Sequence, residues 1–252
     1  MSQSTISSNT LFHFTEFEKL KSILKNGFRP QYCLEDLNGI YFDYNDPELE
    51  HAFPMVCFCD IPLSQIRDHL KYGYYGIGLK KEWGMQNKIT PVLYAYEKSA
   101  IAMSIFKLIV KGWELSKKTE NHEELENIIF YSEYLRSFTK PYQGRLWRRD
   151  KYVEQIRFYD EREWRFVPWQ DPYKHGISKK EFFEPIIEKY QKQLWENIVL
   201  KFNPSDIKYI IVSREDEIVG MIEEIEKNMN NSNDKKLLYS KIISTENILD
   251  DF

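Results

Sequence analysis

Two polar groups lie at the ends of expected strands, and their chemistry would be complementary if the fold brought them together. His13 closes the short alternating stretch 11–14, and Glu163 opens a second stretch at 163–167. A carboxylate between Arg162 and Arg165 is costly to bury without a purpose. The two arginines should keep Glu163 ionised, and an ionised carboxylate can stabilise positive charge that develops in a transition state. The alternative is an exposed strand edge with ordinary ion pairs.

Other kinds of catalytic site have no support in the sequence. The chain has no P-loop, GxGxxG, HExxH or GxSxG pattern, and its five histidines are scattered, so we expect no metal site. Cys57 and Cys59 are two residues apart, which places both on one face of a strand instead of in a zinc-binding CxxC loop. Together with Cys33 they are expected to be free buried thiols of a reducing compartment.

The N-terminal elements would position His13. Residues 11–14 alternate as a short strand, and Thr15 with Glu18 three residues later predicts a capping box at the start of a helix. Gly27 is expected to end that helix in a left-handed conformation. Further strands are predicted at 55–59, 74–79 and 91–96.

The rest of the chain is expected to complete one α+β domain over residues 1–252. Residues 98–138 predict two helices within a helical insertion spanning 98–150. Strands then resume, and alternation places Glu163, Arg165 and Val167 on one face and Trp164 and Phe166 on the other. The tail is predicted as a strand at 207–212, a helix around 218–225 and a returning strand at 237–243.

Charge and hydropathy limit the expected partners and location. The net charge of -4 disfavours strong non-specific nucleic-acid binding. A local basic cluster, Arg145, Arg148, Arg149 and Lys151, is either a solvated loop or a phosphate-contacting patch. The longest apolar run, 101–110, is much shorter than the roughly 20 residues of a membrane helix. The first ten residues are polar and uncharged, which is unlike a secretory signal, so a cytoplasmic protein is expected.

Several segments together resemble one bacterial family. They are Leu11 to Thr15, LKSILKNGF at 20–28, Tyr32-Cys33, PMVCFCDIPLS at 54–64, Tyr72 to Leu79 followed by Glu82-Trp83-Gly84, and Glu163 to Arg165 followed by Val167-Pro168. These segments resemble the abortive-phage-infection family AbiGi, densely over residues 11–97 and again at 160–168. The resemblance implies the antitoxin-type partner of an abortive-infection pair, and therefore a cognate toxin or other defence protein as partner.

The layout also resembles, more distantly, the ADP-ribosyltransferase fold of bacterial toxins that modify nucleic acid. That resemblance implies a split, mostly antiparallel sheet and NAD as substrate, with no metal. It would make Glu163 the catalytic carboxylate and His13 the contact to a ribose hydroxyl. The remaining NAD-binding positions that it implies are Arg29 at the pyrophosphate, Tyr41 or Tyr75 as the stacking face, and Thr15 and Arg165 beside them.

Three functions are therefore compatible with the sequence. One is an NAD-dependent ADP-ribosyltransferase-like enzyme of phage defence, and another is a non-catalytic antitoxin or regulatory protein of a two-gene toxin–antitoxin system. Nucleic-acid binding through the basic cluster is a third. The enzymatic function requires His13 and Glu163 to share one pocket with room for a dinucleotide.

Overall fold

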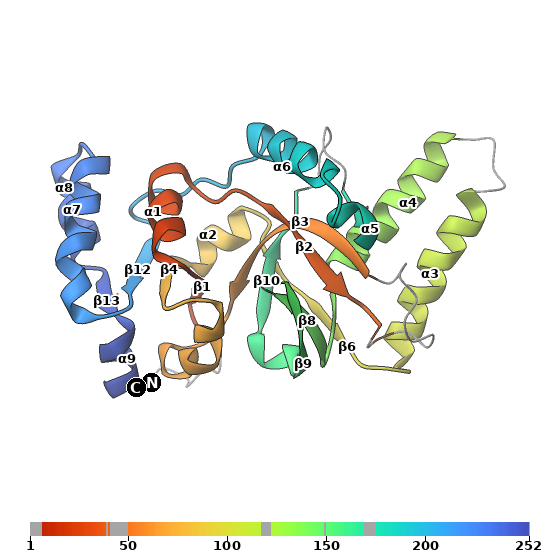
Figure 1. Cartoon of the computed structure of the whole chain (residues 1–252), viewed down its shortest axis with the longest axis horizontal. Helices are drawn as coiled ribbons and strands as arrows, with labels where there is room; N and C mark the ends of the chain where they lie inside the picture. Colours follow the sequence, from red (N-terminus) through yellow and green to blue (C-terminus); the bar gives the residue numbers. More distant parts are fainter. Residues whose placement is uncertain are drawn as a thin grey trace.

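The structure is a computed structural model that describes residues 7–38, 40, 50–116, 122–148, 150–168 and 175–251. Helices pack around one central sheet, as expected for a mixed α/β fold (Figure 1). The molecule is elongated. Helices α3 (Ala100–Ser116) and α4 (His122–Ser137) lie at one end, and α7 (Ile218–Asn228) and α8 (Ser232–Tyr239) lie at the other.

Nine strands of the described residues form the main sheet, and the predicted mostly antiparallel arrangement is confirmed. The strand order is β13-β12-β4-β1-β3-β10-β5, with β2 and β11 also paired to β3. Among the described pairs of this sheet, β12 with β13 is parallel and the others are antiparallel. The strands are β1 (Thr10–Thr15), β2 (Gln31–Asp36), β3 (Glu50–Cys59), β4 (Tyr75–Lys80), β5 (Thr90–Pro91), β10 (Glu163–Phe166), β11 (Ile177–Ser178), β12 (Ile207–Val212) and β13 (Ile242–Ser244).

The long strand β3 joins the two parts of the sheet. Its first six residues pair with β2, and its last four pair with β10. It is buried along nearly its whole length, which agrees with the apolar run in its sequence. Strand β3 thus brings the N-terminal strands and β10 together, although more than a hundred residues separate them in the chain.

Each face of the sheet is covered by its own set of helices. Leu11 and Ile77 point to one face, where they pack with α1 (Phe17–Asn26), α2 (Lys81–Gln86), α7 and α8. Phe12 and Ile211 point to the other face and pack with η2 (Leu63–Tyr72) and α9 (Thr245–Asp251). We call these the α1 face and the η2 face. Short elements complete the fold: η3 (Phe158–Glu161), α5 (Lys179–Phe182), α6 (Ile186–Asn197) and η4 (Glu215–Glu217).

The start of α1 differs from the sequence prediction. Thr15 is the last residue of β1 and pairs with Tyr75, so it cannot also cap the helix. The N-cap is Glu16, without a side-chain hydrogen bond, and the predicted capping box is wrong. Gly27 ends the helix as predicted, with a φ of 83° that suits a residue without a Cβ atom.

The middle of the chain is helical over a shorter stretch than expected. The predicted insertion over 98–150 contains α3 and α4, but after Ser137 it returns to strands. Strand β7 (Thr139–Pro141) pairs in parallel with β6 (Leu93–Ala95), and β8 (Gly144–Arg148) pairs with β9 (Lys151–Ile156). The strand predicted over 237–243 is partly wrong, because α8 continues to Tyr239 and β13 begins only at Ile242. Among the residues described, no helix is long and apolar enough to cross a membrane.

Candidate functional site

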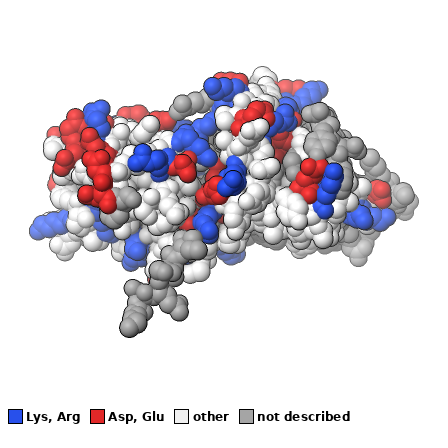
Figure 2. Space-filling view, turned by 90° about the horizontal axis from the view of Figure 1, so that it is seen from below, with Lys and Arg blue, Asp and Glu red and all other residues white. Residues whose placement is uncertain are grey.

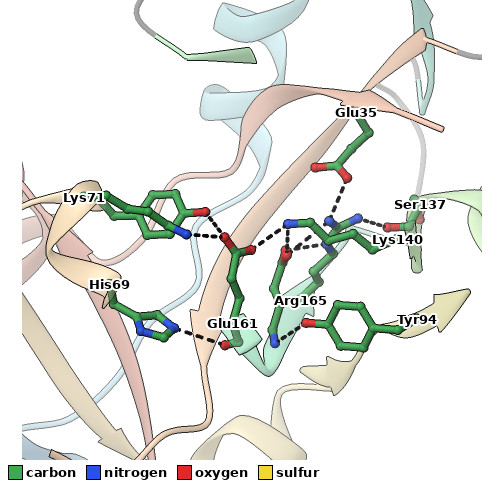
Figure 3. Close-up of polar contacts among 10 residues, drawn as sticks. Glu35, His69, Lys71, Tyr94, Ser137, Lys140, Glu161 and Arg165 are labelled. Atoms are coloured by element: carbon green, nitrogen blue, oxygen red, sulfur yellow. Dashed lines mark hydrogen bonds and ion pairs between the residues drawn. The ribbon is translucent and has the colours of Figure 1, made fainter. Parts of the chain in front are cut away.

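A group of charged side chains meets on the η2 face, and we call it the charge cluster (Figure 3). Its members come from β2, η2, β7, η3 and β10. Arg165 is fully buried, and Glu163 and Lys140 are each 5% exposed. Buried charges at this density are rare unless they are paired. The cluster consists of Glu35, Lys71, Lys140, Glu161, Glu163 and Arg165.

Lys140 lies between two carboxylates. Its Nζ is 3.0 Å from Glu161 Oε2 and forms a second ion pair with Glu163 Oε2. The same ammonium lies 4.5 Å from the centre of the Phe158 ring. Strand β7 therefore joins η3 and β10 through a single cation.

Arg165 holds the other side of Glu163. Its Nε is 2.5 Å from Glu163 Oε1, and its Nη2 is 2.9 Å from Glu35 Oε2. Its Nη1 donates a hydrogen bond of 2.6 Å to the carbonyl oxygen of Ser137. Both carboxylate oxygens of Glu163 are thus bound by protein cations, Oε1 by Arg165 and Oε2 by Lys140.

Neighbouring groups complete the cluster around Glu161. The Lys71 ammonium is 3.1 Å from Glu161 Oε1, and the Tyr72 hydroxyl donates a hydrogen bond to the same oxygen. The backbone N–H of Glu163 donates to the Tyr94 hydroxyl oxygen at 2.7 Å. The pairing therefore extends to η2 and β6.

The electrostatics of the cluster favour the ionised forms of Glu161 and Glu163. Burial alone would raise the pKa of Glu163, but the Arg165 and Lys140 charges outweigh burial and hold that pKa well below its ordinary value. Burial would likewise raise the pKa of Glu161, which Lys140 brings below its ordinary value. The sequence predicts that Arg162 and Arg165 keep Glu163 ionised; in the structure Arg165 lies beside Glu163, and Lys140 takes the place expected for Arg162. Three carboxylates face three cations, so the cluster carries no formal net charge.

His13 lies on the opposite face of the sheet from Glu163. Phe12 and Glu163 are both directly opposite Cys59 on β3, so their side chains share the η2 face. His13 follows Phe12 and points to the α1 face, where its ring centre is 5.3 Å from that of Phe28. The expectation that His13 and Glu163 converge on one pocket is therefore wrong. The reason is that successive side chains of a strand point to opposite faces, and Phe12, not His13, is the residue in register with Glu163 across β3.

His13 is satisfied within the core. Its Nδ1–H donates to the carbonyl oxygen of Cys57 at 2.7 Å, and its ring also packs against Phe58. Burial lowers the pKa of His13, so the neutral imidazole is favoured. A neutral ring with this bond and these contacts is a packing element of the α1 face.

The other residues assigned to NAD binding are divided between locations. Thr15 and Tyr75 pair with each other on the face that carries His13, and the Tyr75 hydroxyl donates to Glu217 at 2.9 Å. Arg29 is exposed, and its Nη1 donates to the Trp195 carbonyl oxygen at 2.6 Å. Arg165 alone lies beside Glu163. Tyr41 is outside the described residues, and binding of NAD stays a prediction.

Sequence reasoning missed most of the charge cluster. Glu161 belongs to the segment that drew attention to Glu163, but Lys140 falls within the predicted insertion and Glu35 within an unremarkable strand. The available signal was the high density of charge at 161–165, which a buried strand tolerates only when distant partners neutralise it.

The thiols and the basic cluster contain no obvious reactive site. The three cysteines are free as predicted, but only Cys59 is buried, and Cys33 and Cys57 are half-buried. Burial raises the pKa of the Cys59 thiol, which disfavours a reactive thiolate. Arg145 pairs with Asp36 at 2.6 Å, and Arg148 donates to the Tyr72 carbonyl oxygen at 2.9 Å. Arg149 is outside the described residues. Figure 2 shows positive and negative side chains interspersed on the face seen from below, without a broad positive surface.

Comparison with known proteins identifies the family. A family model described as abortive phage resistance protein AbiGi, antitoxin, matches residues 26–213. A curated relative from Lactococcus lactis subsp. cremoris, named abortive phage resistance protein AbiGi, is 32% identical over 252 aligned residues. The alignment covers 89% of this chain and 99% of the relative. No solved structure matches the chain. The match spans β2 to β12 and includes the whole charge cluster, and the chain belongs to the AbiGi family of abortive phage resistance proteins.

Proposed function

We propose that this protein is a non-catalytic antitoxin, which protects its host by binding the cognate toxin of an abortive-infection pair. The observation that carries the proposal is the saturation of Glu163, whose two carboxylate oxygens are both held by protein cations. A carboxylate in this state has no free oxygen to offer a substrate, and freeing it would leave Arg165 and Lys140 buried without their partner. The family description as antitoxin supports the same role.

An antitoxin needs a contact surface, and α3 offers one. Ile101, Leu108 and Leu115 are 44%, 51% and 37% exposed and follow one another at seven-residue intervals. That interval places them in one stripe along the helix. Figure 1 shows α3 at the end of the molecule, away from the main sheet. An apolar stripe in such a position is typical of a protein contact surface, so we assign it to the toxin.

The test is relief of toxicity. Genes adjacent to this one are expressed singly in a bacterial host to find a product that arrests growth, and this chain is then co-expressed with that product. We expect growth to be restored, and we expect the pair Leu108→Lys and Leu115→Lys to abolish the rescue. Val219→Lys is the matched control, because Val219 is an apolar residue with 64% exposure on α7 at the opposite end. Growth arrest by this chain alone would contradict the proposal.

The rival function is an NAD-dependent transferase on an ADP-ribosyltransferase-type fold. It predicts that the purified protein cleaves labelled NAD or transfers the label to a component of a bacterial lysate, and that Glu163→Gln abolishes this activity. The placement of His13 and Glu163 on opposite faces supports the antitoxin instead. We expect no cleavage and no transfer. Circular dichroism of the Glu163→Gln protein verifies that a loss of activity is not a loss of fold.

A further inference from the structure

A hollow of about 430 Å³ lies at one end of the β4–β12–β13 part of the sheet. Lys80 is the last residue of β4, Lys208 lies near the start of β12, and Lys241 comes directly before β13. Because these three ends are adjacent, the three side chains line the same hollow. Its remaining walls are Ser205, Ile207, Tyr209 and Leu237.

The three lysines lack carboxylate partners. Within the part of the chain that the structure describes, Lys80, Lys208 and Lys241 form no ion pair. Lys241 Nζ donates to the Pro204 carbonyl oxygen at 2.8 Å, and the nearby Asp206 carboxylate accepts from the Asn203 backbone N–H at 2.8 Å. The hollow therefore has three formal positive charges and no ion pair among its lining residues, while the neighbouring Asp206 carboxylate offsets part of the charge near Lys241.

Lys80 is exposed, and Lys208 and Lys241 are half-buried; other half-buried lysines in the described part of the chain are paired. Lys81, adjacent to Lys80 in the chain, has a side chain 16% exposed and lies 2.7 Å from Asp60. Lys179 is 33% exposed and lies 2.8 Å from Glu50. Burial, followed by the charge of Lys80, lowers the pKa of Lys241, against the smaller opposing effect of the Asp206 carboxylate. Like charges in one hollow repel each other, and a bound anion would remove that repulsion.

The walls of the hollow indicate which chemical group is attached to the anion. Ile207 and Leu237 are apolar, and one face of the Tyr209 ring is stacked on Phe12, with ring centres 5.8 Å apart. Lysine is a common phosphate ligand, and hollows of several hundred Å³ hold small molecules. We propose that this hollow binds a nucleotide-type ligand, with its phosphates on Lys80, Lys208 and Lys241 and its flat base against the apolar wall. The proposal is independent of the antitoxin function.

The ligand is small. A long nucleic acid would experience the charge of the whole protein, which is -4, and the mixed-sign surface seen in Figure 2. A nucleotide experiences chiefly the charges within a Debye length, about 8–10 Å at ordinary salt. The same chemistry is available from a free nucleotide or from the phosphorylated end of a strand. The experiment separates these two sources.

The test measures binding of a fluorescent ATP analogue to the full chain by anisotropy. The variant Lys80→Gln, Lys208→Gln, Lys241→Gln removes the three charges. The control Lys180→Gln, Lys189→Gln, Lys192→Gln removes three exposed charges from α5 and α6. We expect the first triple variant to bind at least about tenfold more weakly and the control to stay within about twofold of the original protein. The single variant Lys208→Gln, expected to bind measurably more weakly, gives a second readout if the triple variant unfolds.

Competitors identify the ligand. Displacement by unlabelled ATP, with inorganic tripolyphosphate weaker, supports the nucleotide. Stronger displacement by a short 5′-phosphorylated thymidine oligonucleotide, lost without its 5′-phosphate, supports the strand end as the source. Equal displacement by tripolyphosphate overturns the role of the apolar wall. No binding at about 1 mM, or equal binding by the first triple variant and the original protein, overturns the site.

Discussion

Replacing Lys140 with methionine removes the cation between two buried carboxylates, and we expect a loss of about 3–5 kcal/mol of unfolding free energy near pH 7. Lys140 Nζ is 3.0 Å from Glu161 and forms a second ion pair with Glu163. At an effective dielectric constant of about 20, a pair at this distance gains roughly 5 kcal/mol before desolvation is subtracted. Methionine keeps most of the side-chain volume, so the loss reports the charge and not a cavity.

The loss should depend on pH in a defined direction. In the original protein the pKa values of Glu161 and Glu163 are lowered, so their contribution to stability is present above the unfolded pKa and is lost as the pH falls through the folded values. Without Lys140 the two carboxylates repel each other, and the pKa of one of them should rise above its unfolded value. The variant then gains stability as the pH falls. The difference between the two proteins should therefore be smaller near pH 5 than near pH 7.

The assay is urea unfolding followed by tryptophan fluorescence at the two pH values. Lys111→Met is the matched control, because Lys111 is 65% exposed and pairs with Glu114 only at the surface. Adding Glu161→Gln to Lys140→Met should recover part of the lost stability, since it removes one of the two facing charges. A loss below about 1 kcal/mol, or an equal loss at both pH values, would refute the assignment of the cluster as a buried ion-pair network.

Three further predictions follow from other parts of the fold. Gly73→Ala should lose more than about 2 kcal/mol, because Gly73 has a φ of 148° and an added Cβ would lie 1.9 Å from the Thr15 carbonyl oxygen. Gly220→Ala, where an added Cβ meets nothing within 4 Å, should instead gain about 0.5–1 kcal/mol; urea unfolding measures both. Burial lowers the pKa of His175 to about 4. The free energy of unfolding should therefore decrease by about 1–3 kcal/mol as the pH falls from 6.5 towards 4, because the unfolded state binds the proton more readily. His175→Gln should flatten that part of the curve of melting temperature against pH. Cys59 should react with a thiol reagent only after unfolding, and fast labelling of the native protein would contradict its burial.

The sequence predicts those strands whose patterns are local, such as β1, β4, β10 and β12, but it misses β2, β7, β8 and the first half of β3. Alternation places Glu163 and Arg165 on one face of β10, and the apolar run marks β3 as buried, as the structure confirms. The end of α1 is likewise local, since Gly27 supplies the left-handed residue. Leu237 was misassigned because an apolar pair near a strand start fits the end of a helix equally well, and packing decides between them.

The separation of His13 from Glu163 could not be predicted from strand ends. Whether two residues share a face depends on the register across β3, which lies between β1 and β10, and a shift of one residue reverses the answer. Lys140 is a comparable case. Its position in the charge cluster follows from the return of the chain to β7 after α4, and no periodicity in the sequence marks that return.

The parallel pairing of β6 with β7 places the two ends of the α3–α4 segment next to each other. The chain departs towards α3 and comes back from α4 at neighbouring points, so the helix pair can change in length or surface while the main sheet keeps its register. Lys140 follows directly after the return and fixes β7 to the interior. If the toxin binds α3 as proposed, a change in these two helices would alter the contact surface without changing the main sheet, provided that Lys140 is kept.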